Sequence, residues 1–112
     1  MRIPTNNKYG AHKTVIDGMV FDSKAEANRW CELKIMERCG AISDLERQRK
    51  FPLINKSRYG GEICYIADFV YRENSETVVE DVKSKATATP LYKLKKRLMA
   101  EIHGIEIREV GI

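Results

Sequence analysis

The sequence predicts an α/β (α+β) fold in which helices pack on a mixed β-sheet. Helix-start signals precede two segments, 23–39 and 89–104, and each segment ends at a glycine that can stop a helix. Two runs rich in β-branched and aromatic residues, 62–71 and 77–83, lie between them and read as a hairpin. A last apolar run, at 105–110, follows the second helix and reads as a strand. Together with the run at 77–83 it would form a strand–helix–strand unit, in which the two strands are parallel. The predicted order is αβββαβ, with a central mixed β-sheet flanked by helices.

The N-terminal region predicts a loose start followed by a small hairpin. Residues 1–12 are polar and are expected to form a flexible N-terminal arm. Asp17-Gly18 then stands between short apolar segments within residues 13–21, a pairing typical of a two-residue hairpin turn. We therefore expect one folded domain over residues 13–112.

The first helix carries a capping signature. Ser23 is a good N-cap, and Glu26 stands three positions later, which makes a capping box. Glu26, Trp30 and Leu33 recur at helical spacing, so they should share one stripe facing the sheet. Gly40 is the expected stop.

The segments that flank the central hairpin are less clear. Residues 41–45 and 51–54 read as two short strands on either side of a basic stretch, Arg47-Gln48-Arg49-Lys50. Thr89 and Pro90 then supply an N-cap and a first helical residue for the second helix.

Composition excludes several classes of protein. The 112 residues carry a net charge of +4, which suits a polyanionic partner, and contain no apolar run of membrane-spanning length. The N-terminus lacks the apolar core of a signal peptide. The three cysteines, Cys31, Cys39 and Cys64, form no CxxC pair, so we expect buried, reduced thiols in a cytoplasmic protein.

The central hairpin brings two aspartates together if its turn centres on Asn74-Ser75. Asp68 then lies directly opposite Asp81, with Cβ atoms about 4.5–5.5 Å apart on one face. Like charges in this position destabilise a sheet, so a raised pKa or a bound cation must offset them. Glu80 should point to the opposite face, as a surface or packing residue. A loop of odd length would shift the register and separate the aspartates.

The tripeptide Asp81-Val82-Lys83 adds a cation on the same face, because alternate residues of a strand share a face. Two carboxylates suit Mg²⁺. Phosphodiester hydrolysis needs this combination, since the metal makes water acidic enough to attack and the lysine meets charge developing on phosphorus. Acid-x-Lys alone is common, and a solvated strand of mixed charge would look the same.

The order FDSKAEANRW, LERQRKF, YIADFV and VVEDVKS resembles the PD-(D/E)XK nuclease superfamily, in particular its phage Holliday-junction-resolvase-like and transposon-end endonuclease groups. The resemblance runs from residue 8 to about residue 110. It implies a restriction-endonuclease-like core and Mg²⁺-dependent cleavage of DNA, with Mn²⁺ expected to substitute for Mg²⁺.

Position by position, the resemblance assigns four catalytic residues: Glu26, Asp68, Asp81 and Lys83. Asp68 and Asp81 match the metal ligands, Glu26 a helix carboxylate that holds the metal or its water, and Lys83 the catalytic lysine. The backbone carbonyl of Val82 would complete the metal shell.

Two positions depart from the pattern, and one role stays open. Ala67 replaces the proline of the name motif, and Arg49 follows Gln48 where relatives often have proline. Glu26 could instead act only as the acidic partner of the capping box, with its carboxylate turned back to the Ser23 amide.

Basic residues near this site are candidate contacts for nucleic-acid phosphates. A basic helix is also commonly just a solvated face. The candidates are Lys85, Lys93 and Lys96 around the second helix, and Arg49 and Lys50 in the earlier basic stretch.

These observations predict a metal-dependent endodeoxyribonuclease that acts on duplex or branched DNA, as a homodimer whose two sites cut two strands. The alternative is a non-catalytic nucleic-acid-binding accessory protein, in which the acidic pair is incidental. A third possibility is a structural subunit whose charged helices pair with a protein.

Overall fold

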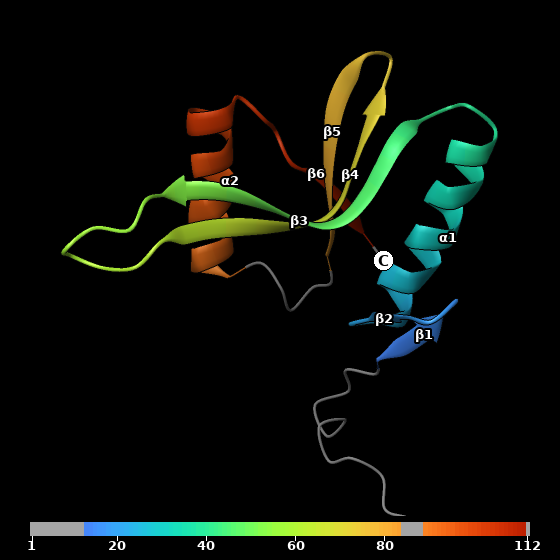
Figure 1. Cartoon of the computed structure of the whole chain (residues 1–112), viewed down its shortest axis with the longest axis horizontal. Helices are drawn as coiled ribbons and strands as arrows, with labels where there is room; N and C mark the ends of the chain where they lie inside the picture. The colour runs from blue at the N-terminus through green and yellow to red at the C-terminus, as the bar shows by residue number, and fades with distance from the viewer. Residues whose placement is uncertain (1–12, 84–88, 112) are drawn as a thin grey trace, which may run out of the picture.

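The computed structural model describes residues 13–83 and 89–111, and its fold is α+β, with a mixed sheet and two helices (Figure 1). The predicted N-terminal arm, residues 1–12, lies outside the described residues. The elements are, in order, β1 (Thr14–Ile16), β2 (Met19–Phe21), α1 (Lys24–Arg38), β3 (Ser43–Ile54), β4 (Ile63–Glu73), β5 (Glu76–Lys83), α2 (Pro90–His103) and β6 (Arg108–Gly111).

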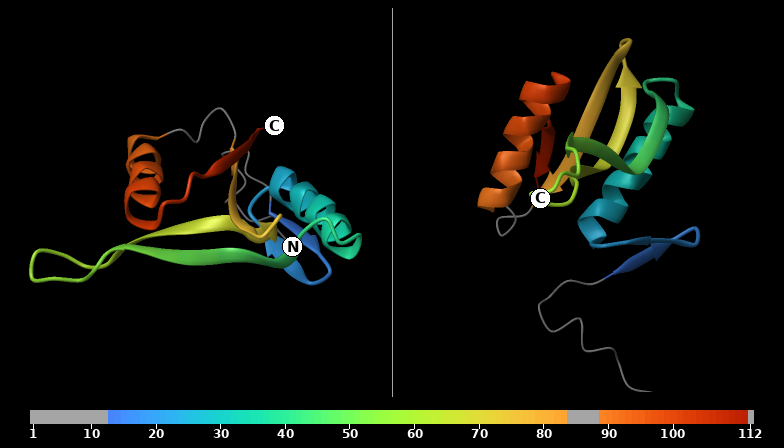
Figure 2. Two further views of the ribbon diagram at one scale, coloured as in Figure 1. Left: turned by 90° about the horizontal axis from the view of Figure 1, so that it is seen from above. Right: turned by 60° about the vertical axis from the view of Figure 1, so that its left-hand side comes forward.

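The main sheet has the order β3-β4-β5-β6, with β6 parallel to β5 and the other pairs antiparallel. Two separate apolar clusters hold it together: Trp30 and Leu33 of α1 belong to one, and Met99 of α2 to the other. The two helices therefore pack on different parts of the sheet, on either side of β5 (Figures 1 and 2). The strand order and the parallel β6 agree with the predicted αβββαβ arrangement.

The small hairpin β1–β2 forms as predicted. Asp17 and Gly18 both have positive φ, at 50° and 79°, which is the backbone of a tight two-residue turn. Phe21, at the end of β2, is fully buried in the cluster under α1 and lies 6.1 Å from the Trp30 ring. The hairpin thus leads the chain directly into the first helix.

Helix α1 has the predicted ends. The Ser23 side chain accepts a hydrogen bond from the amide of Glu26 at 3.1 Å, and Gly40 has the left-handed φ of 83° just after the C-cap. Glu26, Trp30 and Leu33 are buried, as their spacing predicts.

Helix α2 also begins and ends where the sequence predicts. The Thr89 hydroxyl accepts from the amide of Tyr92 at 3.1 Å, and Pro90 fills the first turn. Gly104 adopts φ 67° and ends the helix, with its amide bonded to the Ala100 carbonyl at 3.1 Å.

The prediction of two short strands around the basic stretch is wrong. A single strand, β3, runs through residues 43–54. It lies at the edge of the sheet, where charged side chains reach solvent without leaving the ladder, so the basic residues do not interrupt it. A register shift near Asp44, whose φ is 55°, bends the strand at its start.

The β4–β5 turn has the predicted centre. Asn74 and Ser75 have φ values of 53° and 67°, and Glu73 pairs with Glu76 on either side of them. This turn fixes the register of the whole hairpin.

No helix in the described ranges combines the length and the apolar character needed to cross a lipid bilayer. The expectation that the cysteines are buried is wrong, because Cys39 is exposed and Cys31 and Cys64 are partly exposed.

Candidate active site

The hairpin register brings the two predicted aspartates together. The last pair of the ladder is Phe69 with Glu80, and the side chains of Asp68 and Asp81 meet one position beyond it. Asp68 is half-buried and its Oδ2 accepts the backbone amide of Val82 at 2.8 Å. Asp81 is only 7% exposed. Two carboxylates therefore meet in a place from which water is largely excluded.

Burial and proximity change the ionisation of this pair. The pKa of Asp68 is raised above its usual range, first by burial and then by its contact with Asp81. Asp81 receives two donors on its Oδ2, the Tyr65 hydroxyl at 2.8 Å and Lys83 Nζ at 3.1 Å. The pair thus carries less negative charge than two free carboxylates, and a cation between them would remove the repulsion.

Lys83 is held in a defined position beside Asp81. Its Nζ lies 3.4 Å from the centre of the Tyr92 ring, a cation–π contact, and its side chain is 18% exposed. Tyr92 is fixed in turn by its hydroxyl, which donates to Glu109 at 2.7 Å. Lys96 approaches the same Glu109 oxygen at 3.1 Å, and these two donors lower the pKa of Glu109. Helix α2 therefore fixes the position of the Lys83 ammonium group through Tyr92.

The backbone amide of Glu26 takes part in the helix cap, whereas its side chain points toward Gln48. Its amide binds Ser23, whereas its carboxylate accepts from Gln48 Nε2 at 3.3 Å. Burial and Asp22 raise the pKa of Glu26, Asp81 raises it further, and Arg47 opposes them. The charge of Asp81 therefore acts on the ionisation of Glu26, but among the described residues Glu26 does not join Asp68 and Asp81 in a group that could hold a metal ion.

Gln48 adopts an unusual backbone conformation at this level of the sheet. Its φ is 58°, a left-handed value that a non-glycine residue in a strand rarely takes. The ladder pairs Arg47 with Phe69 and Arg49 with Ala67, so Gln48 lies opposite Asp68. Strained backbone of this kind clusters at functional sites.

The strain has a visible structural consequence in the arginines on either side of Gln48. Arg47 lies 4.2 Å from the centre of the Phe21 ring, in the cluster under α1. Arg49 lies 5.0 Å from the centre of the Phe51 ring, in the cluster under α2. In a regular strand both would share one face.

The described residues do not gather enough ligating side chains for a metal with a closed protein shell. Among the side chains of residues 13–83 and 89–111, no group of three or more histidine, cysteine, aspartate or glutamate residues could hold a metal ion. Mg²⁺ typically binds one or two carboxylates and keeps several waters. Asp68 and Asp81 could supply these two carboxylates.

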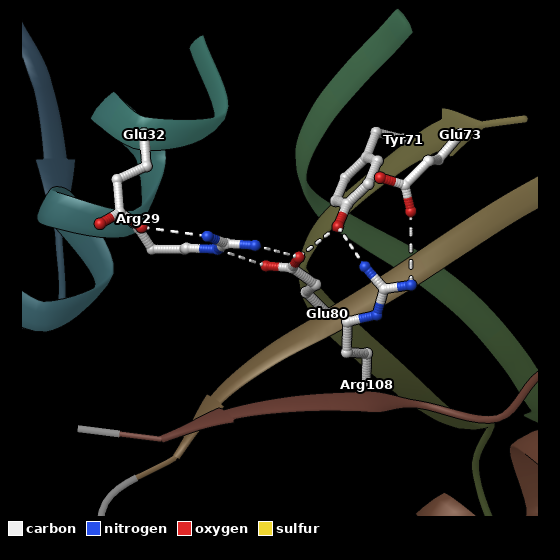
Figure 3. Close-up of polar contacts among 6 residues, drawn as sticks. All are labelled: Arg29, Glu32, Tyr71, Glu73, Glu80 and Arg108. Carbon is white, nitrogen blue, oxygen red and sulfur yellow. Dashed lines mark hydrogen bonds and ion pairs between the residues drawn. The ribbon is translucent and has the colours of Figure 1, made fainter. Parts of the chain in front are cut away.

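The carboxylate next in sequence to Asp81 belongs to a different network (Figure 3). Glu80 is fully buried, so of the two expected positions, surface or packing, it takes the packing one. Arg29 of α1 donates hydrogen bonds to both carboxylate oxygens of Glu80, at 2.9 Å and 2.7 Å. The Tyr71 hydroxyl donates to one of the same oxygens. Glu32 binds the outer side of Arg29 at 3.0 Å. The bidentate pair satisfies the buried charge and links α1 to β5.

The network continues to the last strand. Arg108 of β6 donates to the Tyr71 hydroxyl at 3.1 Å and approaches Glu73 at 3.4 Å. Burial and Glu80 raise the pKa of Tyr71 to about 12, so it stays protonated and acts as a donor. Three strands and one helix thus meet at Glu80.

The predicted nucleic-acid contacts are dispersed. Lys93 is exposed on α2, and Lys96 is paired with Glu109. Arg49 and Lys50 make exposed ion pairs, with Glu46 at 3.3 Å and Glu62 at 2.7 Å respectively. Lys85 lies outside the described residues.

Sequence reasoning missed the two groups that orient the site, Tyr65 and the Tyr92 ring. Simple alternation sets Tyr65 and Asp68 on opposite faces, so it gives no reason to connect Tyr65 with Asp81. In the sequence Tyr92 is simply one residue of the basic second helix, and nothing there connects it with Lys83. The Tyr92 ring orients Lys83 because Lys83 Nζ lies over it, and this contact depends on how α2 packs on the sheet.

The raised pKa of Asp68 predicts a pH-dependent cost in stability. Between the ordinary aspartate pKa and the raised one, the folded state holds a proton that the unfolded state has lost, so stability falls as pH rises through this window. Asp68→Asn removes that cost and still accepts the Val82 amide. In chelator, its melting temperature should exceed that of the wild type by about 4 °C or more near pH 8, and the difference should shrink toward pH 4.

Thermal unfolding followed by circular dichroism checks this prediction. Glu101→Gln, at an exposed position on α2, is the matched control and should show no such trend. A difference between Asp68→Asn and wild type that stays constant from acid to alkaline pH would refute the assignment.

Comparison with known proteins gives one match. No curated protein and no solved structure matches the chain. Residues 6–109, nearly the whole chain, match the profile of one family, DUF1064. The chain therefore belongs to the DUF1064 family, whose members are described as proteins of unknown function.

Proposed function

We propose that the protein is a Mg²⁺-dependent DNA endonuclease with a restriction-endonuclease-like core, of the PD-(D/E)XK type. The observation that carries the proposal is the meeting of Asp68 and Asp81 on neighbouring strands, with Lys83 Nζ 3.1 Å from Asp81. Like charges across a sheet oppose folding, so stability alone is a weak reason to place two carboxylates together beside a lysine. This arrangement does suit phosphodiester hydrolysis.

In this proposal each side chain has a separate task. Asp68 and Asp81 hold Mg²⁺, which when bound supplies positive charge and makes an attacking water more acidic. Lys83 lies beside them and meets an oxygen of the scissile phosphate as negative charge develops there. Glu26 assists by holding the metal or its water.

The resemblance extends the proposal to the substrate and assembly. The substrate is duplex or branched DNA, Mn²⁺ replaces Mg²⁺, and two copies of the chain cut the two strands. Lys93 and Lys96 belong to α2, the helix that carries Tyr92, and would contact phosphates that flank the scissile one.

A cleavage assay tests the proposal. The purified protein is offered four-way junctions, flaps and linear duplex, with Mg²⁺, with Mn²⁺, with Ca²⁺ and with chelator. We expect cleavage of at least one substrate with Mg²⁺ and Mn²⁺, and none with chelator. Binding of DNA without cleavage of any substrate in either metal would instead favour the non-catalytic accessory protein.

A further inference from the structure

The end of the β3–β4 hairpin projects from the body of the molecule (Figures 1 and 2). We call residues 51–65 the projecting ribbon. Within the described residues, β4 pairs with β5 only from Phe69 onward, so the ribbon is two-stranded. Its base is covered by α2, where Phe51 and Tyr65 pack in the cluster that contains Met99. Beyond that point both strands run out into solvent.

The tip of the ribbon is an ordered turn with two large side chains at its centre. Ser57 and Gly60 exchange backbone hydrogen bonds at 2.9 Å and 3.2 Å, which closes the turn around Arg58 and Tyr59. The Ser57 hydroxyl also accepts the Tyr59 amide at 3.1 Å. The turn therefore holds its two central residues in a defined position.

These two residues form an aromatic and cationic unit. Tyr59 is 84% exposed, more than the other large apolar side chains of the described residues that face solvent. The Arg58 guanidinium lies 4.9 Å from the centre of its ring and donates to its hydroxyl at 2.7 Å. Stacking on the tyrosine pre-arranges the arginine, which lowers the entropy lost when it binds a partner.

The charged residues of the outer part of the ribbon, residues 51–61, are all basic. Lys56 and Arg58 lie between Phe51 and Gly61, and that stretch has no acidic residue. Glu62, the nearest acid, is neutralised by Lys50 at 2.7 Å. The outer part of the ribbon thus presents two cations and a tyrosine to solvent, which complements a polyanion.

We infer that the projecting ribbon is a DNA-binding element that enters a groove of duplex DNA beside the carboxylate site. This inference rests on the proposed function and extends it to a mode of substrate binding. The major groove admits a two-stranded β-ribbon. Gly60 lies eight positions before Asp68, and β4 begins at Ile63. The tip therefore contacts DNA at most about 26 Å from the carboxylates, or up to about seven base pairs along the duplex.

The test measures DNA affinity in chelator by fluorescence anisotropy, over a series of salt concentrations. Lys56→Ala/Arg58→Ala should weaken binding to linear duplex about tenfold or more, and should reduce the slope of log affinity against log salt by about two. Tyr59→Ala should weaken binding and leave the salt slope unchanged, because it removes contact area and no charge.

The matched control is Lys34→Ala/Arg38→Ala, which removes the same charge from the far end of α1. The inference is overturned if the ribbon variants bind DNA like this control, or if they change the molecular mass in light scattering while DNA affinity is kept. The latter result would make the ribbon an interface between copies of the chain.

The same experiments distinguish failure of the ribbon assignment from failure of the endonuclease proposal. If the wild-type protein cleaves DNA and the ribbon variants bind as well as the control, only the ribbon assignment is wrong. If the ribbon variants lose affinity but no variant and no wild-type protein cleaves DNA in Mg²⁺ or Mn²⁺, the ribbon assignment stands and the endonuclease proposal is wrong.

Discussion

Asp81→Asn should abolish Mg²⁺-dependent cleavage and leave DNA binding intact. Asp81 is the carboxylate that faces Asp68 and contacts Lys83, so the substitution removes a metal ligand and the negative partner of the lysine. Loss of several kcal/mol of electrostatic stabilisation corresponds to a fall in cleavage rate of about a thousandfold or more. Single-turnover cleavage and anisotropy with the same DNA measure the two effects.

The comparison needs a variant that loses a carboxylate without touching the site. Glu106→Gln, at an exposed position before β6, provides it and should cleave at the wild-type rate. An Asp81→Asn protein that folds, binds DNA and still cleaves within about tenfold of the wild-type rate would remove Asp81 from the mechanism.

Glu80→Gln should strongly destabilise the fold, although it changes the shape of the side chain very little. The Glu80 carboxylate has no exposure to solvent, and Arg29 bonds to both of its oxygens. Neutralising one partner of a buried ion pair leaves the other charge uncompensated, which costs about 3 kcal/mol. For a domain of this size the melting temperature should fall by about 10 °C or more. Chemical denaturation gives the free energy of unfolding directly.

Two matched variants separate burial from charge. Glu32→Gln removes the other carboxylate that binds Arg29, but this one is exposed, so it should cost less than about 1 kcal/mol. Arg29→Met/Glu80→Met removes both buried charges together and should recover most of the lost stability. Equal costs for Glu80→Gln and Glu32→Gln would show that burial of the pair has no energetic weight.

Local chemistry was enough to predict the register of the central hairpin. Asn74 and Ser75 tolerate the positive φ that a two-residue turn requires, and such a turn permits only one register. The position of Asp68 opposite Asp81 follows from it. The ends of both helices were predictable for the same reason, because Ser23, Thr89 and the following glycines act on neighbouring backbone groups.

Features that depend on the edge of the sheet were not predictable. The basic stretch at residues 47–50 looks like a loop by composition, yet it continues β3 because its side chains reach solvent from an edge strand. The left-handed backbone at Gln48 has no local sequence signal, since glutamine is not a residue that favours positive φ.

The partners of the site depend on contacts between distant elements. Glu80 looks like a surface residue until α1 sets Arg29 against it, 51 positions earlier in the chain. Tyr65 reaches Asp81 only because β4 changes the face that it presents near Asp68. A single sequence gives the site's carboxylates and lysine, but the groups that orient them emerge from the packed structure.

The occupancy of the space between Asp68 and Asp81 tests the central claim most directly. Crystals grown at a pH near 8 and soaked in Mn²⁺ would be measured at a wavelength where manganese scatters anomalously. We predict an anomalous peak bridging the two carboxylates, and its loss in crystals of Asp81→Asn. Ordered carboxylates with no peak between them, in crystals that show manganese bound elsewhere, would contradict the account.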